Sequence, residues 1–338
     1  MTPPSPSTRH PRTLSIGGAT YDLFVRTGKD VLHEDRGRKV LELPLGDKVR
    51  VQQVIETCGG GAANTAVGLA RLGCNAHFSG ILGSDQWGER QLENFRKEQV
   101  DASGTSVVEG ETSSFSIILS ADSGERVILY DPGTNAHLHD ANFDRQTAAG
   151  MDWIYLNHLH ERSCVIEDDI AAILQKNVNT GLTWNPGGSQ LKTGMKEATM
   201  RTLLAQTDLL VLNKEEVLLF TGESSVDAAM TALLKSGVRI VCVCDGKNGA
   251  TASDGEHKWH CPVTETPVID TTGAGDAFGT GATWALLQGL GLPEMLRAGT
   301  ISAASVLGAI GAQAGLLTDI QIRQRLQTVR LEVMELPS

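Results

Sequence analysis

Late in the chain, a glycine-rich segment runs directly into a long apolar stretch. The segment reads Asp270-Thr271-Thr272-Gly273-Ala274-Gly275-Asp276, and the apolar-rich stretch continues from Ala277 to Leu287. Because this stretch is long enough for a helix, Gly273 to Asp276 are expected at the helix N-terminus. Unpaired backbone N–H groups and the positive end of the helix dipole meet at such an end and form a site for an anion.

Asp276 places a carboxylate beside this anion site. An isolated Asp before an apolar helix is usually a plain N-cap. Here the preceding Gly273, Ala274 and Gly275, the second acid Asp270 and a partner motif far upstream favour a functional role. A carboxylate next to an anion hole can accept the proton of an attacking hydroxyl in phosphoryl transfer. Asp276 is therefore the candidate catalytic base, and the backbone amides of the three small residues are candidates for stabilising the moving phosphoryl group.

The partner motif is a second glycine cluster, Gly59-Gly60-Gly61, which follows the extended run from Val49 to Thr57. It opens a predicted helix that ends at Gly73. A dinucleotide fingerprint, typical of an oxidoreductase, would need a third Gly where Asn64 stands. Asn64 instead offers donors and an acceptor suited to vicinal hydroxyls, and the glycines allow a flat ligand to lie against the backbone. Read alone, the motif is equally consistent with a close helix–strand crossing.

The two motifs, in this order, resemble the two signatures of the ribokinase-like carbohydrate kinases, also called the phosphofructokinase-B-type family. The similarity extends from Leu14 to about Leu317. It implies an α/β fold with a mainly parallel central sheet flanked by helices and a small β-sheet lid. It also implies an ATP-dependent phosphotransferase that moves the γ-phosphate of ATP to a hydroxyl of a small sugar or nucleoside, with ATP and Mg²⁺ as cofactors.

The resemblance assigns a substrate site. Asp22 follows the first predicted strand and is expected to grip substrate hydroxyls. Gly60, Gly61 and Asn64 complete this site. His158 also follows a predicted strand, and we expect it near the substrate rather than on a metal, because no third ligand is evident.

The nucleotide side is assigned in the same way. Asn213 and Glu216 match the family's Asn-x-x-Glu element, which organises magnesium, water and the nucleotide phosphates, and Glu216 is expected to act on Mg²⁺ through water. Taken alone, Glu216 is typical of an acid in the first turn of a helix. Asp245, Gly246 and Gly249 stand where the family places a nucleotide-binding loop, although a simple hairpin turn explains these residues equally well.

A monovalent-cation site is a further implication. Gly311-Ala312-Gln313 resembles a segment whose carbonyls help to hold such a cation near the anion hole in ribokinases. Asp270 and Gly311 are therefore the candidate K⁺ residues. The neighbouring Ala314-Gly315 departs from the family pattern, which leaves K⁺ dependence an open point of the resemblance.

Composition fits a soluble cytoplasmic enzyme. The chain has 338 residues with 29 basic and 40 acidic side chains, a net charge of −11 and no basic run. Binding to nucleic acid or to an anionic membrane is therefore not expected. The longest apolar runs fall well short of a membrane span. The six cysteines show no C-x-x-C spacing and are expected as reduced thiols.

The order of elements predicts the domain organisation. Residues 1–12 are rich in Pro and Ser and are expected to form a disordered tail, and residues 13–333 form one kinase domain. Strands and helices alternate along most of this domain, which indicates a mainly parallel sheet covered on both faces. Two regions within the segments of about 20–57 and 111–132, namely Val40–Thr57 and Ser113–Tyr130, have strand-like alternation without helices, and the second contains a turn at residues 121–125. By the resemblance they form a lid that excludes water and that pairs with the lid of a second copy in a homodimer.

The expected elements are as follows. The strands are Thr13–Ile16, Asn75–Ile81, Trp153–Asn157, Gly181–Trp184, Leu209–Leu212 and Arg239–Cys244. The helices are Asn64–Leu72, Gly88–Glu98, Ile166–Asn177, Lys214–Thr221, Val226–Ser236, Ala274–Gln288, Pro293–Gly308 and Asp319–Glu332.

The sequence favours a neutral substrate over a sugar phosphate. A kinase for a phosphorylated sugar needs cationic side chains to hold the existing phosphate, ideally a bidentate Arg. The cations identifiable near the expected site are Arg26, Lys29, Lys48 and Arg126. The alternatives are a sugar-phosphate kinase and a catalytically silent sugar- or nucleotide-binding regulatory protein on the same fold.

Overall fold

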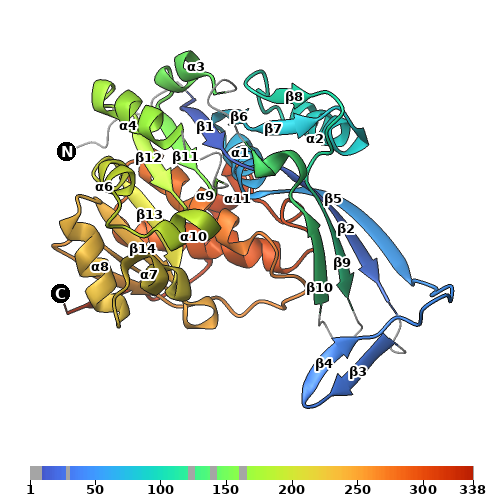
Figure 1. Cartoon of the computed structure of the whole chain (residues 1–338). Helices are drawn as coiled ribbons and strands as arrows, with labels where there is room; N and C mark the ends of the chain where they lie inside the picture. The colour runs from blue at the N-terminus through green and yellow to red at the C-terminus, as the bar shows by residue number, and fades with distance from the viewer. Residues whose placement is uncertain (1–9, 28–30, 121–125, 138–142, 160–165, 338) are drawn as a thin grey trace.

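A nine-stranded sheet lies at the centre of the computed structural model, which describes residues 10–27, 31–120, 126–137, 143–159 and 166–337 (Figure 1). Its strands run in the order β17-β16-β15-β14-β13-β12-β11-β1-β6. Strands β6, β1, β11, β12, β13 and β14 are mutually parallel, and β15, β16 and β17 add an antiparallel edge. The bounds are β1 Arg12–Ile16, β6 Asn75–Ser79, β11 Trp153–Leu156, β12 Gly181–Trp184, β13 Leu209–Asn213, β14 Ile240–Cys244, β15 Ala250–Ser253, β16 Lys258–Cys261 and β17 Met334–Leu336.

Helices cover both faces of this sheet (Figure 1). The bounds are α1 Gly61–Arg71, α2 Gln86–Lys97, α3 Arg145–Ala149, α4 Glu167–Lys176, α5 Gly188–Thr193, α6 Ala198–Leu204, α7 Lys214–Thr221, α8 Val226–Lys235, α9 Ala274–Leu287, α10 Leu292–Leu307 and α11 Asp319–Thr328. Successive residues of a strand point to opposite faces of the sheet, so β13 contributes side chains to the core on both faces. Leu210 and Leu212 pack with α4, α6, α7 and α8, whereas Leu209 and Val211 pack with α9, α10 and α11.

A second, four-stranded sheet projects from this body in the order β10-β9-β2-β5 (Figure 1). Its strands are β2 Thr20–Arg26, β5 Gln53–Gly59, β9 Phe115–Ser120 and β10 Arg126–Asp131. The hairpin of β3 (Leu32–Asp35) and β4 (Arg38–Leu41) forms its tip. These strands lie within the segments predicted to form the lid, except that β5 runs on to Gly59. The turn expected at 121–125 and residue Lys29 lie outside the described residues.

The fold confirms the predicted class, and most predicted elements match within a few residues. The strand expected from Asn75 to Ile81 is broken into β6 and β7 (Ile81–Gly83), which pairs with β8 (Ser106–Val108). The break falls at Gly80, where a Cβ would lie 2.5 Å from the carbonyl oxygen of Gly17. The helix expected to reach Glu332 ends at Thr328, because the following residues turn back so that β17 can pair with β16.

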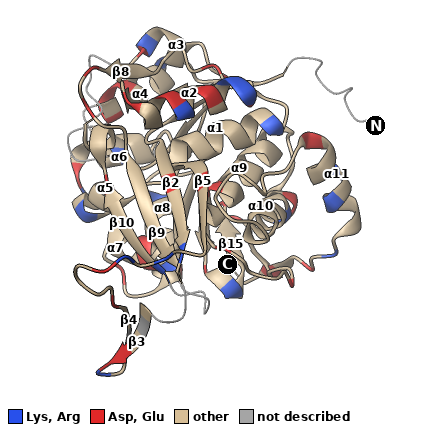
Figure 2. Cartoon of the chain, turned by 90° about the vertical axis from the view of Figure 1, so that its right-hand side faces the viewer, with Lys and Arg blue, Asp and Glu red and all other residues tan. Residues whose placement is uncertain are grey.

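The N-terminal boundary differs slightly from the prediction, because Arg12 already belongs to β1. Most of the expected tail lies outside the described residues. No single helix among the described residues is long and apolar enough to cross a membrane, and only the bent pair α7 and α8 passes by length and composition. Charges of both signs are interspersed over the face drawn in Figure 2, without a continuous basic stripe.

Candidate active site

The carboxyl ends of the parallel strands meet along one edge of the central sheet. Gly17 follows β1, Asn157 follows β11, Asn185 follows β12, Asn213 ends β13 and Asp245 follows β14. In open α/β sheets, ligands bind in the crevice outside this edge. Polar side chains from segments far apart in the sequence are therefore gathered where a ligand is expected.

A cavity of about 170 Å³ opens at this edge, beneath the base of the lid. Its lining residues are Gly17, Gly18, Thr20, Gly60, Gly61, Ile81, Tyr130, Asn135, Asn157, His158, Leu159, Asn185 and Asp276. The predicted site residues Gly60, Gly61, His158 and Asp276 are thus brought together. The cavity combines glycine backbone with polar side chains, which suits a small polar ligand.

Helix packing brings Asn64 to Asp276. The two helices α1 and α9 cross closely at Gly68, where a Cβ would lie 2.7 Å from Thr280 Cγ2. Asn64 lies one helical turn before Gly68, and Asp276 lies one turn before Thr280, so the two polar residues face each other at the same end. Asn64 Nδ2 donates a hydrogen bond of 2.8 Å to Asp276 Oδ2. The sequence predicted both residues, but not this contact.

The protein environment tunes the carboxyl group of Asp276. Loss of solvation raises its pKa to about 6, and the hydrogen bond from Asn64 acts in the opposite direction. The group is therefore mostly ionised at neutral pH but binds a proton more readily than an exposed Asp. A general base of this kind is most effective when its pKa lies near the working pH.

The predicted anion hole lies at the start of α9. Gly273 is the N-cap, with a left-handed φ of 78°, and a Cβ on it would lie 2.3 Å from the Ala312 side chain. Only glycine fits both the conformation and this contact. Nothing among the described residues lies within 4 Å of a Cβ built on Gly275, so the space in front of the first helical turn is open.

Asp22 lies on the lid face that is turned toward the body, but it does not line the cavity. Its carboxylate accepts a hydrogen bond of 2.5 Å from Ser116 Oγ and covers Gly59, whose Cβ would lie 2.2 Å from Asp22 Oδ2. Burial raises the pKa of Asp22 to about 6, with a smaller contribution from the charge of Asp270, while the Ser116 hydrogen bond lowers it. The expected hydroxyl-gripping residue is therefore adjacent to the cavity and covered in this conformation.

The candidate nucleotide residues lie farther along the same sheet edge. Asn213 and Glu216 cap α7 reciprocally: Asn213 Oδ1 accepts from the Glu216 N–H at 2.9 Å, and Glu216 Oε2 accepts from the Asn213 N–H at 2.8 Å. Glu216 is thus in the first turn of a helix, as the sequence alone suggests, and it forms a capping box with Asn213. Lys214 links this corner to Asp245 through an ion pair of 3.4 Å.

This corner combines a partly buried carboxyl group with an open stretch of backbone. Burial raises the pKa of Glu216. Gly246 has a positive φ of 51°, and no atom of the described residues lies within 4 Å of its Cβ position, so backbone faces open space beside Asp245. Among the described residues, no group of three or more His, Cys, Asp or Glu is arranged to hold a metal ion by itself. A divalent ion here would need phosphate oxygens and water to complete its shell.

The expected K⁺ residues make a different set of contacts. Asp270 accepts hydrogen bonds from the N–H of Gly311 at 3.0 Å and from the N–H and Oγ1 of Thr272 at 3.0 and 2.7 Å. Arg126, from lid strand β10, forms an ion pair of 2.5 Å with Asp270 and also donates to Thr271 Oγ1 at 2.9 Å. Burial acts to raise the pKa of Asp270, but these contacts together outweigh it and leave the pKa below its usual value.

Two site residues were missed at the sequence level. Asn135, after lid strand β10, donates to Ala19 O at 3.1 Å, and Asn157 donates to Thr65 Oγ1 at 3.1 Å. The buried Oδ1 atoms of both residues accept no hydrogen bond from the described part of the chain. Asn157 could have been inferred from its place at the carboxyl end of a buried strand. Asn135 lies in an irregular segment that carries no such signal.

Comparison with known proteins agrees with this architecture. The pfkB family carbohydrate kinase profile matches residues 31–319. An uncharacterized sugar kinase from Archaeoglobus fulgidus is 29% identical over 254 residues, covering 74% of this chain and 98% of that protein. A ribokinase from Haemophilus influenzae is 28% identical over 267 residues, covering 77% of this chain and 84% of the relative.

Solved structures show the same fold. The Arabidopsis thaliana ribokinase complexed with ribose and ATP superposes with a TM-score of 0.77 at 21% identity, covering 94% of this chain and 99% of that one. A putative Ribokinase II from E. coli superposes with a TM-score of 0.79 at 18% identity, covering 95% of this chain and all of the other. Since the family profile spans most of the sequence, this chain belongs to the pfkB family of carbohydrate kinases.

Proposed function

We propose that this protein transfers the γ-phosphate of ATP to a hydroxyl of a small neutral sugar or nucleoside, with Asp276 as the catalytic base. The observation that carries the proposal is the position of Asp276, which lines the cavity beside the open N-terminus of α9. Asp276 belongs to the first turn of α9, so a base and an anion site lie next to each other, and these are the two groups that transfer of a phosphoryl group to a hydroxyl requires. Relatives named ribokinase and fructokinase support this assignment.

The reaction follows from this placement. The substrate hydroxyl lies in the cavity next to Asp276 and gives its proton to the carboxylate as its oxygen bonds to the γ-phosphorus. The bond from phosphorus to the bridging oxygen of ADP breaks on the opposite side. The backbone N–H groups of Gly273, Ala274 and Gly275 would stabilise the charge on the transferred group, because they lie at the positive end of α9, where the space beside Gly275 is open.

The polar atoms of the cavity favour a neutral polyol as the acceptor. The Oδ1 atoms of Asn135 and Asn157 are buried acceptors without a donor among the described residues. Buried acceptors are normally satisfied, so hydroxyl groups of a bound sugar would complete them. The described lining contains neither Lys nor Arg. These features offer no charge to hold a phosphate.

On the nucleotide side, Asp245, Gly246 and Gly249 would hold the base and ribose of ATP, and Asn213 and Glu216 would hold the phosphates through Mg²⁺-bound water. When bound, Mg²⁺ neutralises charge on the phosphates. The open backbone at Gly246 and the raised pKa of the half-buried Glu216 fit this assignment. A related structure, a putative Ribokinase II in complex with ATP and Mg²⁺, supports the choice of nucleotide and metal.

For the monovalent cation, we expect a weak dependence on K⁺. The Asp270 carboxylate already faces the guanidinium of Arg126 and three donors from Thr272 and Gly311. An additional cation at Asp270 would have to displace Arg126 or use the carbonyls near Gly311. Replacing K⁺ by tetramethylammonium in the assay is expected to change turnover less than about twofold. A loss of turnover of tenfold or more would support a functional K⁺ site at Asp270.

We also propose a cytoplasmic homodimer that forms through the lid. Leu23, Val25, Ile117 and Leu119 share the outer lid face with Val54, Val127 and Leu129, whose side chains are 50%, 41% and 51% exposed. Strands β5 and β10 are the edges of this sheet. An apolar face with free strand edges is normally covered, and a second lid has the matching shape and chemistry. Light scattering should report a dimer that Leu129→Lys converts to a monomer, while Leu219→Lys on distant α7 should not.

A sugar-phosphate kinase is the second candidate, and one observation favours it. A further cavity of about 220 Å³ lies between the lid and the body and contains Arg26, Arg126 and Asp270 among its lining residues. A related protein is named ATP-dependent ribose-1-phosphate kinase. The Arg126 guanidinium is engaged by Asp270, however, so only a substrate phosphate that displaces this ion pair could use it.

The deciding experiment measures ADP release with a panel of acceptors. We expect kcat/KM for ribose, fructose, adenosine or cytidine to exceed that for fructose 6-phosphate and fructose 1-phosphate. A sugar phosphate that wins by tenfold or more would select the second candidate. A thermal shift with ATP and Mg²⁺, but none with NAD, together with no turnover of any acceptor, would indicate a silent binding protein on the same fold.

A further inference from the structure

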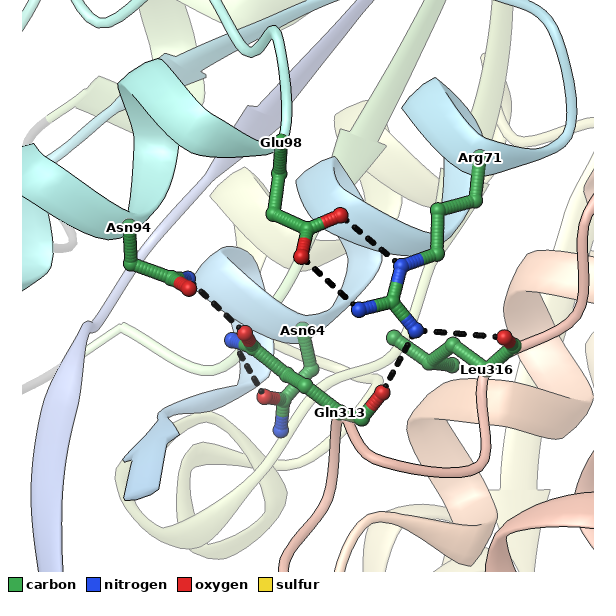
Figure 3. Close-up of polar contacts among 6 residues, drawn as sticks. All are labelled: Asn64, Arg71, Asn94, Glu98, Gln313 and Leu316. Atoms are coloured by element: carbon green, nitrogen blue, oxygen red, sulfur yellow. Dashed lines mark hydrogen bonds and ion pairs between the residues drawn. The ribbon is translucent and has the colours of Figure 1, made fainter. Parts of the chain in front are cut away.

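The amide of Asn64 that contacts Asp276 is itself held by another amide. Gln313 donates from Nε2 to Asn64 Oδ1 at 3.2 Å, and Asn94 donates from Nδ2 to Gln313 Oε1 at 2.9 Å. Figure 3 shows Asn94 on α2, Gln313 on the segment after α10 and Asn64 on α1 joined in this order. We propose that Gln313 is a positioning residue that keeps the NH₂ group of Asn64 on Asp276, an inference that rests on the proposed role of Asp276.

The side chains of Asn94, Gln313 and Asn64 form a row of three amides that ends at Asp276, and the hydrogen bonds along this row run in one direction. Every amide has an oxygen that only accepts and an NH₂ group that only donates. Asn94 donates to Gln313, Gln313 to Asn64 and Asn64 to Asp276, and an ionised carboxylate at the end can only accept. Turning the Asn64 amide alone would place its oxygen against Asp276 and its NH₂ group against the NH₂ group of Gln313. Gln313 therefore selects the one orientation that presents a donor to the base.

The backbone of Gln313 is clamped as well. Its carbonyl oxygen accepts from Arg71 Nη1 at 2.7 Å, and the same nitrogen donates to Leu316 O at 3.2 Å. The other side of the guanidinium forms two hydrogen bonds of 2.8 Å with the carboxylate of Glu98 (Figure 3). A paired, bidentate Arg is a rigid support. The segment that carries Gln313 is thereby tied to α1 and α2, the helices that carry Asn64 and Asn94.

The orientation of the Asn64 amide affects the pKa of Asp276 because the amides are buried. The side chains of Asn64 and Gln313 belong to residues that are only 3% and 7% exposed, so water has little access to replace a lost partner. The hydrogen bond from Asn64 lowers the pKa of Asp276 against the effect of desolvation. An oxygen in place of the NH₂ group would repel the carboxylate and raise that pKa further. Gln313 therefore acts at a distance on the fraction of Asp276 that is ionised at neutral pH.

The test is the pH profile of kcat/KM for Gln313→Met, which keeps the length of the side chain and removes its polar atoms. On the acid side of this profile, kcat/KM falls as Asp276 takes up a proton, and we expect this acid limb to move to higher pH by about one unit. A shift of this size corresponds to the loss of one hydrogen bond to a charged group. Gln313→Glu should move it at least as far, because an ionised Glu has no donor for Asn64 Oδ1. Gln288→Met, at the far end of α9, is the matched control and should leave the limb in place.

A double-mutant comparison separates positioning from general damage to the fold. In an Asn64→Ala background, Gln313→Met should produce no further shift, because the amide that it orients is gone. Asn94→Leu removes the first donor of the row and should shift the limb in the same direction by a smaller amount. If Gln313→Met does not fold, the shift of the acid limb in Asn94→Leu tests the proposal in its place.

Failure of this proposal is distinct from failure of the proposed function. Suppose that the wild type is active and that folded Gln313→Met keeps the same acid limb. This result would overturn the positioning role of Gln313 and leave the kinase assignment intact. If Gln313→Met does not fold, an unchanged acid limb in Asn94→Leu has the same meaning. If the wild type phosphorylates no acceptor, the carboxyl carbon of Asp276 can be titrated by ¹³C NMR without turnover. An upward shift of its pKa in the variant would then support the role of Gln313, and an unchanged pKa would reject it.

Discussion

Two opposing effects set the protonation of Asp276. Its surroundings remove solvent and raise the pKa, and Asn64 donates a hydrogen bond that lowers it, with a net value of about 6. A carboxyl group balanced in this way is ionised before the reaction and can still accept a proton during it. Both residues could be chosen from the sequence, because Asn64 and Asp276 each stand directly after the small residues of a glycine motif.

Replacing the base tests this role directly. Asp276→Asn should lower kcat by roughly 10²–10⁴, the usual contribution of a positioned general base, because an amide cannot take up the hydroxyl proton. Binding of ATP and folding should persist, since Asn occupies the same volume. Steady-state kinetics and a nucleotide titration measure both effects. Near-normal turnover would remove Asp276 from the mechanism.

The pH dependence of activity should reflect the same group. With a pKa of about 6, Asp276 is protonated and inactive as a base at lower pH, so kcat/KM should fall below about pH 6. Asp22 also has a pKa of about 6, and Asp22→Asn is therefore the necessary control. This variant should raise KM but keep an acid limb. Loss of the limb in Asp22→Asn would assign it to Asp22 instead.

The raised pKa also has a consequence for stability, with a definite sign. The folded chain retains the Asp276 proton up to about pH 6, whereas an unperturbed carboxyl releases it near 3.8. The stabilisation from protonated Asp276 is therefore complete at pH values below the unfolded pKa and is lost as pH rises through 6. Asp276→Asn should consequently gain in melting temperature relative to the wild type between pH 4 and pH 8. A constant difference across this range would argue against the shift.

At the scale of elements, the N-terminus of α9 combines Gly273, which the fold requires, with Gly275, which we propose to be functional. Gly273 has a left-handed φ of 78° and touches Ala312, whereas Gly275 is helical and faces open space. Gly275→Val should lower turnover about 100-fold by filling the phosphate position, with little change in melting temperature. Gly273→Ala should instead lower the melting temperature, because it introduces a clash and backbone strain. Equal thermal losses in both variants would make Gly275 structural too.

Local patterns predicted these elements well where the pattern was complete within one segment. Strand β12 and helix α7 have the predicted bounds, because a buried run and a capping box define them without distant partners. Strands β15 and β16 were not predicted, since their short, mixed sequences become strands through pairing with β14. The N-terminal capping of α7 likewise shows Asn213 and Glu216 in a structural role that the motif alone could not separate from phosphate binding.

The site residues also divide into those that a local motif predicts and those that only tertiary packing brings into place. Gly60, Gly61 and Asp276 lie in motifs whose geometry is local, and the structure places them on one cavity. Asn135 and Gln313 reach the site only because the loops that carry them fold back onto segments distant in sequence, at Ala19 and at Asn64. Their partners are 116 residues away for Asn135 and 249 residues away for Gln313. Such contacts are set by tertiary packing, which a single sequence does not display.

At the scale of the whole molecule, the lid and the body meet at both the proposed acceptor site and the proposed phosphate site. Tyr130, near the end of β10, and Asn135, in the segment that follows this strand, line the main cavity, and Arg126, at the start of β10, holds Asp270 just before the predicted anion hole. Movement of one strand therefore changes both sites together. A lid coupled in this way can exclude water from the phosphoryl group until both substrates are bound.

Hydrogen exchange tests this coupling. We expect amides in β2, β5 and β9 to exchange more slowly when the preferred acceptor is present at saturation, because closure fixes the lid against the cavity. Amides in β12, at the centre of the main sheet, serve as the internal control and should not change. Arg126→Ala should reduce the protection in β10 and in residues 270–272, since it removes the ion pair that joins them. Equal exchange of the lid with and without acceptor would show that these strands are a fixed part of the body and take no part in closure.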